Sequence, residues 1–203
     1  MRTSLFFVCA LALATVGCGG KKPIVPLGTT QPDRFLFDRG NQELQNKNWV
    51  NARTYFMQIV DNYPQSPLRP DAKLGIGDSY LGENSVESVV LAANEFKEFL
   101  SFYPTSARAD YAQYKLAMSH FAKMRAAERD QTETRDALKE FDAFFERYPN
   151  SALMPEVKQK WREARDRLTA ASYRVGVFYF RSRWYPGAIA RFREVLEIGR
   201  AHV

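Results

Sequence analysis

Residues that could carry out catalysis are scarce in this sequence. Of its two histidines, His120 stands within an apolar-patterned stretch, where we expect a packed or half-exposed structural side chain. No group of His, Cys and carboxylate residues has the spacing of a metal site. Gly75 and Gly77 fall inside an expected helix, whereas a phosphate-binding loop would follow a strand. We therefore predict that the protein is not an enzyme and has no catalytic residue, no metal and no cofactor.

The residue with the clearest chemistry is Cys18. It follows a basic start and an apolar run over residues 5–16, which is too short for a bilayer span of ~20 residues. This order is typical of a secretory signal, so we assign residues 1–17 as a signal peptide. Residues 15–18, Thr-Val-Gly-Cys, resemble the bacterial lipobox, although that motif prefers Leu where threonine stands. We predict that Cys18 becomes the lipidated, palmitate-bearing start of the mature protein; an ordinary signal with an incidental cysteine is the alternative.

Cysteine usage and the next residues indicate where this lipid would sit. Cys9 and Cys18 are the two cysteines of the chain, so nothing downstream can form a disulfide. Gly19 follows Cys18, whereas Asp at that place is the known inner-membrane retention signal of well-studied bacteria. We therefore predict an anchor in the outer membrane, facing the periplasm, and a flexible tether over residues 18–32.

One phrase occurs three times, at separations of 40 and 45 residues. It consists of an aromatic residue, two apolar residues and then Tyr-Pro-x-Ser. Self-similarity at such a period predicts a solenoid, in which each unit buries its apolar face on the next unit. Solenoids usually bind other proteins. The copies are Phe56 to Ser66, Phe96 to Ser106 and Phe141 to Ser151.

We predict an all-α tetratricopeptide-repeat solenoid of about four helix-pair units, coiled as a right-handed superhelix, over residues 33–197. Gly40 and Ala52 would let two helices cross closely, Phe56 would fill the space between units, and Pro64 would end the unit. The serines after each Tyr-Pro pair suit capping of the next helix. We expect helices over 33–45, 49–62, 69–81, 86–102, 108–126, 132–147, 155–183 (with a break near Thr169 left open) and 185–197.

The connection inside the third unit is the longest and ends in Glu-Arg-Asp-Gln-Thr, residues 128–132. It carries paired charges and a helix N-cap candidate, Thr132 or Asp130. A capped loop without further function is the simplest interpretation.

The C-terminal residues 198–203, Ile-Gly-Arg-Ala-His-Val, match one reading frame of a common sequencing adapter. We expect that this tail is non-native read-through and that the native chain continues. The repeated phrase begins a fourth time at Phe192, but Gly199 and Arg200 stand where Tyr-Pro is due. We therefore assign no function to His202.

The formal net charge of +6 is unevenly distributed. By our count, residues 19–104 contain 9 basic and 10 acidic residues, and residues 105–196 contain 18 and 12. A basic back half suits an acidic protein partner or anionic headgroups. We expect no nucleic-acid partner, because an exported, lipid-anchored protein rarely meets nucleic acid and the charges are interspersed at helical spacing.

Four features together resemble the BamD family, outer-membrane lipoproteins of the β-barrel assembly machinery. The resemblance spans about residues 18–196 and implies a periplasmic adaptor that binds the barrel-forming subunit and accessory lipoproteins and helps receive unfolded outer-membrane proteins. The family pattern has five units, whereas this chain has about four, which agrees with truncation. The features are the acylatable Cys18, the unequal units with Tyr-Pro-x-Ser ends, the Arg129-Asp130-Gln131 segment, and a fourth unit running from Gly176 to Arg191.

The resemblance also implies two sets of site residues. An arginine of the fourth unit makes a salt bridge to the barrel-forming partner in that family, and Arg191 occupies that place; we group Arg129, Asp130 and Gln131 with it as partner contacts. An ordinary solvated arginine is the alternative. The first units are thought to bind the C-terminal strand of substrates, and the matching groove positions here are Arg34, Phe37 and Asn41. Alternatively, the tether or a neighbour covers that helix face.

Two other functions remain open at this point. One is another periplasmic tetratricopeptide adaptor, associated with the Tol-Pal system or peptidoglycan. The other is the helper region of a larger cell-envelope enzyme whose catalytic part lies beyond residue 197.

Overall fold

The computed structural model describes residues 25, 26 and 28–200, without the side chain of residue 200. The predicted signal peptide, Cys18, most of the predicted tether and residues 201–203 therefore lie outside the described residues. The predictions made for them stay predictions.

Every regular element of the described residues is a helix, as predicted. The bounds match the sequence-based ranges closely except in the third and fourth units. The helices are α1 (Pro32–Gln45), α2 (Trp49–Asn62), α3 (Arg69–Glu83), α4 (Val86–Phe102), α5 (Ala109–Ala122), α6 (Thr132–Arg147), α7 (Met154–Arg181) and α8 (Tyr185–Arg200).

The largest differences from the predictions are in α5, α7 and α8. Helix α5 ends at Ala122, four residues early, because tighter turns replace the α-helical bonds there: the amides of Lys123 and Met124 donate to carbonyls three residues back. Helix α7 is unbroken at Thr169, whose hydroxyl donates to the Arg165 carbonyl at 2.9 Å within the helix. Helix α8 continues past residue 197.

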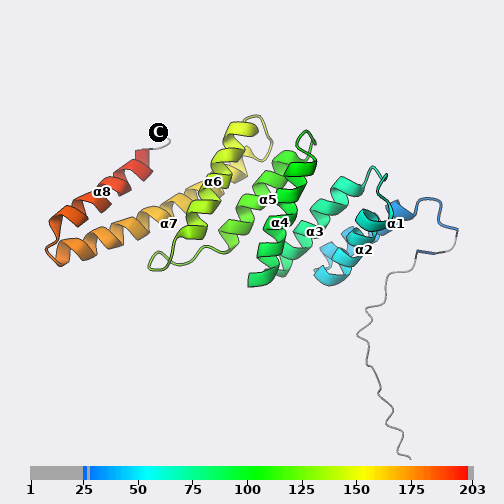
Figure 1. The fold of residues 1–203 in the computed structure, drawn as a ribbon, viewed down its shortest axis with the longest axis horizontal. Helices are drawn as coiled ribbons and strands as arrows, with labels where there is room; N and C mark the ends of the chain where they lie inside the picture. The colour runs from blue at the N-terminus through cyan, green and yellow to red at the C-terminus, as the bar shows by residue number, and fades with distance from the viewer. Residues whose placement is uncertain (1–24, 27, 201–203) are drawn as a thin grey trace, which may run out of the picture.

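The helices form a single row in which each packs on the next (Figure 1). The row runs from α1 at one end to the α7–α8 pair at the other, and it confirms the predicted tetratricopeptide-like solenoid. Because neighbours along the chain are neighbours in space, the core divides into local clusters, each shared by adjacent units.

The aromatic residue of each repeat fills a space that small residues leave open. Phe56 on α2 is fully buried, and a Cβ atom added at Gly40 or Gly75 would lie 2.7 or 2.6 Å from its ring. Contacts this short are not sterically allowed, so the ring needs a glycine on both α1 and α3. The same arrangement recurs between Phe96 and Gly77, at 2.7 Å. The predicted roles of Gly40 and Phe56 are thus confirmed.

The serines of the Tyr-Pro-x-Ser turns do not cap the next helices as predicted, because the N-cap residues are Leu68, Arg108 and Leu153. The Ser66, Ser106 and Ser151 side chains each accept a hydrogen bond from the amide two residues ahead, at 3.1 Å, in the turn before the helix. Ser66 also donates to Asp33 at 2.6 Å, and this hydrogen bond lowers the Asp33 carboxyl pKa. The turn thereby connects the end of one unit to α1.

Candidate functional site

A groove of about 590 Å³ lies among the α5–α6 loop, α7 and α8, and we call it the docking groove. It brings the predicted Arg129-Asp130-Gln131 segment to the same surface as Arg191, although more than 50 residues separate them in sequence. The groove therefore combines an exposed loop with the fourth unit. Its lining residues are Ala127, Glu128, Arg129, Asp130, Gln131, Arg135, Leu168, Ala171, Ser172, Arg174, Val175, Phe178, Tyr179 and Arg191.

Gln131 gives the loop its shape. Its side chain is only 6% exposed, and its amide nitrogen donates to the carbonyls of Ala126 and Arg129, each at 2.9 Å. Its amide oxygen accepts a hydrogen bond from the buried Thr134 hydroxyl at 2.8 Å. Since the side chain is used within the loop, any contribution of Gln131 to a partner contact would come from holding Arg129 and Asp130 in place.

The loop extends toward α7 (Figure 1). Arg174 of α7 forms an ion pair with Glu128, and Arg167 of α7 donates to the Arg125 carbonyl at 3.1 Å. Two separate turns of α7 thus hold the loop, and one wall of the docking groove is fixed by tertiary contacts.

The N-cap prediction for this loop was wrong. Gln131 is the N-cap residue of α6, and its side chain makes no capping hydrogen bond. Thr132 is already inside the helix, and its hydroxyl donates to the Asp130 carboxylate at 3.0 Å. The N-cap therefore lies between the two predicted candidates, and the helix begins directly after the buried Gln131. A sequence pattern does not reveal that this glutamine is buried.

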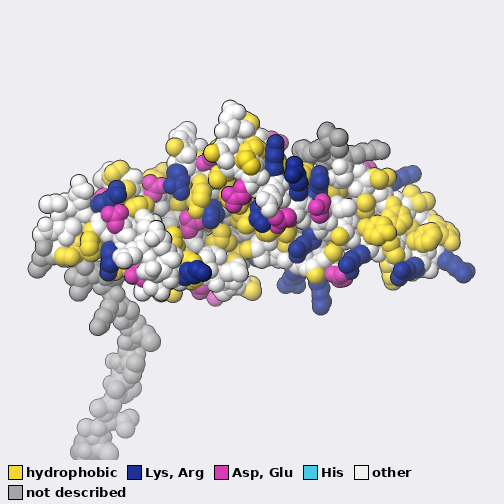
Figure 2. Space-filling view, turned by 180° about the vertical axis from the view of Figure 1, so that it is seen from behind, with side chains coloured by type: hydrophobic (Ala, Val, Ile, Leu, Met, Phe, Trp, Pro, Cys, Tyr) yellow, Lys and Arg dark blue, Asp and Glu magenta, His cyan; other side chains and the backbone are white. Residues whose placement is uncertain are grey.

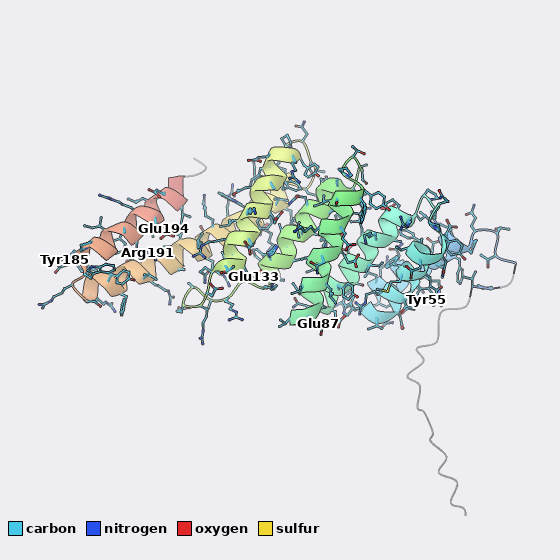
Figure 3. All side chains as sticks on the ribbon, viewed as in Figure 1. Tyr55, Glu87, Glu133, Tyr185, Arg191 and Glu194 are labelled. Carbon is cyan, nitrogen blue, oxygen red and sulfur yellow. The ribbon has the colours of Figure 1, made fainter. Side chains whose placement is uncertain are left out.

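Arg191 lies on α8 next to α7, with Glu194 beside it (Figure 3). Its guanidinium donates to the Glu194 carboxylate at 2.8 Å, and the Arg191 side chain is 44% exposed. An exposed i,i+3 pair of this kind contributes little to stability, about 0.2–0.5 kcal/mol. Arg191 can therefore exchange Glu194 for a carboxylate on another protein at small cost.

Exposed aromatic residues surround the far end of α7 and α8, and Figure 2 shows this apolar end flanked by Lys and Arg. Trp184 is among them and is 54% exposed, so it is not part of a repeat core. The sequence does contain a sign of this exposure, the run Phe178-Tyr179-Phe180. Three consecutive aromatic residues cannot all lie on the buried face of one helix, so at least one of them must be exposed. The large exposed side chains here are Tyr173, Phe178, Phe180, Trp184, Tyr185, Ile189 and Leu196.

The second predicted set, Arg34, Phe37 and Asn41, lies on α1. Phe37 is partly buried and packs edge-on against Phe56, with ring centroids 5.8 Å apart. Arg34 is exposed and pairs with Asp38 at 3.1 Å. The half-buried Asn41 and the exposed Arg34 are thus separated by a ring that partly belongs to the core. The assignment of these residues to a substrate groove stays a prediction.

His120 lies half-exposed in an ion-pair network between α5 and α6. Its Nδ1 atom is 2.9 Å from the Glu133 carboxylate, which also forms an ion pair with Lys123. The side chains of His120, Glu133 and Asp136 bring possible metal-ligand atoms within 4.8 Å of one another. The spacing of these residues in the sequence did not indicate this cluster. Because Lys123 and His120 already hold the Glu133 carboxylate, the geometry supports a structural ion pair between the two helices.

Glu133→Gln should reduce stability at neutral pH by less than about 1 kcal/mol, since the network is partly exposed. Burial alone would raise the Glu133 pKa, but hydrogen bonds from Lys123 and His120 outweigh burial and lower it. A lowered folded-state pKa stabilises the fold above the unfolded pKa of ~4.3 and loses this effect as pH falls through the folded value. Urea unfolding at pH 6.5 and pH 3 should therefore show a larger wild-type advantage at pH 6.5 than at pH 3. An equal difference at both pH values would contradict this network.

No helix among the described residues is long and apolar enough to span a bilayer.

Comparison with known families gives a match to the YfiO family model, described as "Outer membrane lipoprotein", over residues 29–198. Several curated proteins are also similar to the chain. It is 28% identical over 190 residues to the outer membrane protein assembly factor BamD of Caulobacter vibrioides, covering 92% of this chain and 61% of that protein. It is 25% identical over 199 residues to BamD of Helicobacter pylori, covering 97% and 87%.

A third relative is BamD of Rickettsia prowazekii, 25% identical over 191 residues, with 92% of this chain and 72% of the relative covered. The chain thus spans between 61% and 87% of the length of these three relatives. Their names describe assembly factors, which agrees with the prediction that this protein is not an enzyme. Because the family model matches residues 29–198, well over half of the chain, the protein belongs to the YfiO family of outer membrane lipoproteins.

Proposed function

We propose that this protein takes part in the assembly of outer-membrane proteins, as a non-catalytic adaptor on the periplasmic face of the outer membrane. Its family and the names of its BamD relatives support this role. We further propose that it docks on the barrel-forming assembly subunit and on accessory lipoproteins and helps receive unfolded outer-membrane proteins. A solenoid of helix pairs suits such a role, because it presents extended surfaces to other polypeptides.

The observation that carries this proposal is the docking groove. Arg129 of the loop and Arg191 of α8 line the same groove, beside the exposed Phe178 of α7. Arginine and aromatic side chains are the types that dominate the energy of protein interfaces. An acidic surface of the barrel-forming subunit would match the basic back half of the chain.

The proposed anchor and the proposed docking groove would lie far apart. Helix α1 and helix α8 are at opposite ends of the row (Figure 1). A lipid at Cys18 would attach the α1 end to the membrane, and the groove at the α7–α8 end would then reach into the periplasm. Near the anchored end, Arg34, Phe37 and Asn41 would contact an apolar substrate peptide and its terminal carboxylate.

Arg191→Glu should weaken binding of the barrel-forming subunit by roughly tenfold or more, because a paired charge at an interface becomes a repulsive one. The matched control is Arg193→Glu, since Arg193 is an exposed arginine on the same helix that does not line the groove. The measurement is co-purification from detergent-solubilised outer membranes, with far-ultraviolet circular dichroism to show equal helicity. Equal losses for Arg191→Glu and Arg193→Glu, or no loss for either, would remove Arg191 as a contact. Failure of the wild-type chain to retain any barrel-forming subunit would overturn the proposed function.

A further inference from the structure

The middle of the solenoid carries a second groove, which we call the central groove. It has a volume of about 540 Å³ and lies where α4, α5 and α6 pack side by side (Figure 1). It shares no lining residue with the docking groove. We propose that the central groove binds an extended acidic segment of another polypeptide. Its lining residues are Val90, Ala93, Asn94, Lys97, Leu100, Gln113, Leu116, Ser119, His120, Lys123, Lys139, Glu140, Ala143 and Arg147.

Cations surround this groove. Four of its lining side chains are Lys or Arg and one is Glu140; one of the four cations, Lys123, is paired with Glu133, which lies outside the lining. Among the described residues, Lys97, Lys139 and Arg147 form no ion pair, although all three are exposed. Three cations from α4 and α6 are therefore available to carboxylates from outside the chain.

Two lysines of neighbouring helices differ from Lys97 and Lys139, because both are paired within the chain. Lys73, one unit earlier, is paired with both Glu95 and Glu98, at 3.0 and 2.9 Å. Lys115, on α5, is paired with Asp78 at 3.3 Å. Carboxylates of the same chain thus neutralise Lys73 and Lys115, whereas Lys97 and Lys139 of the central groove form no ion pair among the described residues.

The single carboxylate of the lining, Glu140, is bound by a buried amide. Gln113 is 1% exposed, and its amide nitrogen donates to the Glu140 side-chain oxygen at 2.8 Å and to the Glu140 carbonyl at 3.1 Å. This buried amide fixes the Glu140 side chain against α5. Neither Lys139 nor Arg147 pairs with it, so the positive field of the groove is not cancelled from inside.

The lining between the cations favours a peptide over other anions. Val90, Ala93, Leu100, Leu116 and Ala143 offer aliphatic surface, which a free inorganic anion would not use. The side-chain amide of Asn94 can pair with the backbone of an extended chain. No Phe, Tyr or Trp of the described residues lines the groove, and single-stranded nucleic acid binds largely by stacking on such rings. An extended segment that alternates Asp or Glu with small aliphatic residues fits this chemistry.

The test is fluorescence anisotropy with a labelled ten-residue peptide that alternates Glu and Val, titrated with the purified chain in 50 mM salt. The control peptide replaces each Glu with Gln, which keeps the shape and removes the charge. The protein variants are Lys97→Glu/Lys139→Glu in the groove and Lys158→Glu on α7, an exposed lysine outside it. Circular dichroism checks that each variant keeps its helicity.

We expect the Glu peptide to bind at least tenfold more tightly than the Gln peptide, and we expect 0.5 M salt to remove most of this difference. The double reversal should weaken binding by about tenfold or more, since it removes two ion pairs with the peptide and adds repulsion. Equal binding of the two peptides, or an equal loss in Lys158→Glu, would overturn the proposal. So would sedimentation showing that the groove instead joins two copies of the chain. Lys97→Glu/Lys139→Glu should leave retention of the barrel-forming subunit unchanged, which separates this site from the docking groove.

Discussion

Phe56→Ala should lower the free energy of unfolding by about 3–5 kcal/mol, the usual cost of removing a fully buried phenylalanine ring. The ring lies between α1 and α3, against Gly40 and Gly75, and meets Phe37 edge-on. These neighbours cannot collapse into the space, because each is held in its own helix. Urea unfolding followed by circular dichroism measures the loss. Phe102→Ala, at a side chain that is 69% exposed, is the control and should change stability by less than about 0.5 kcal/mol.

A double-mutant cycle makes this prediction specific to the ring. Gly75→Ala alone should cost about 1–3 kcal/mol, because its Cβ atom would lie 2.6 Å from the Phe56 ring. In the Phe56→Ala background the overlap is gone, so the same change should be neutral or stabilising by up to ~1 kcal/mol through helix propensity. Additive effects of the two substitutions would show that Gly75 is not there to accommodate Phe56.

Gln131→Leu should cost roughly 1–3 kcal/mol, because it leaves the buried Thr134 hydroxyl without its acceptor. It should also loosen the α5–α6 loop, whose carbonyls at Ala126 and Arg129 lose the amide that joins them. Hydrogen exchange of the loop amides should therefore become faster in this variant, while exchange in α2 stays unchanged.

The companion variant is Gln131→Leu/Thr134→Val. Removing both polar partners leaves no buried group unsatisfied, so most of the lost stability should return while loop exchange stays fast. If stability does not return, the cost of Gln131→Leu comes from misfit of the leucine side chain and not from the hydrogen bond.

The fold could be predicted from the sequence because its causes repeat. Phe56, Phe96 and Phe141 recur with the same Tyr-Pro-x-Ser ending, and each is fully buried. Pro64 and its counterparts stop each unit at the same point, so most helix ends were also predictable. The repeated phenylalanine and the repeated proline can both be recognised from a short stretch of sequence. Because their contacts are within a unit or with the next one, no distant part of the chain is needed to predict them.

The docking groove was only partly predictable, because its geometry is not local. The family resemblance implied that Arg191 and Arg129 are partner contacts. That both line one groove depends on tertiary contacts such as the ion pair between Glu128 and Arg174. The burial of Gln131 likewise depends on the path of the whole loop.

Helix α7 has a mechanical consequence for any adaptor built on it. With 28 residues and no break, it is a rod about 42 Å long. Val157 and Trp161 fix its first half in the cluster shared with α6, and Gly176 fits its second half against Phe192 of α8. A displacement of α8 should therefore also move the helix that packs against the other end of α7, which is α6. The unbroken α7 has no hinge between its halves that could absorb the movement.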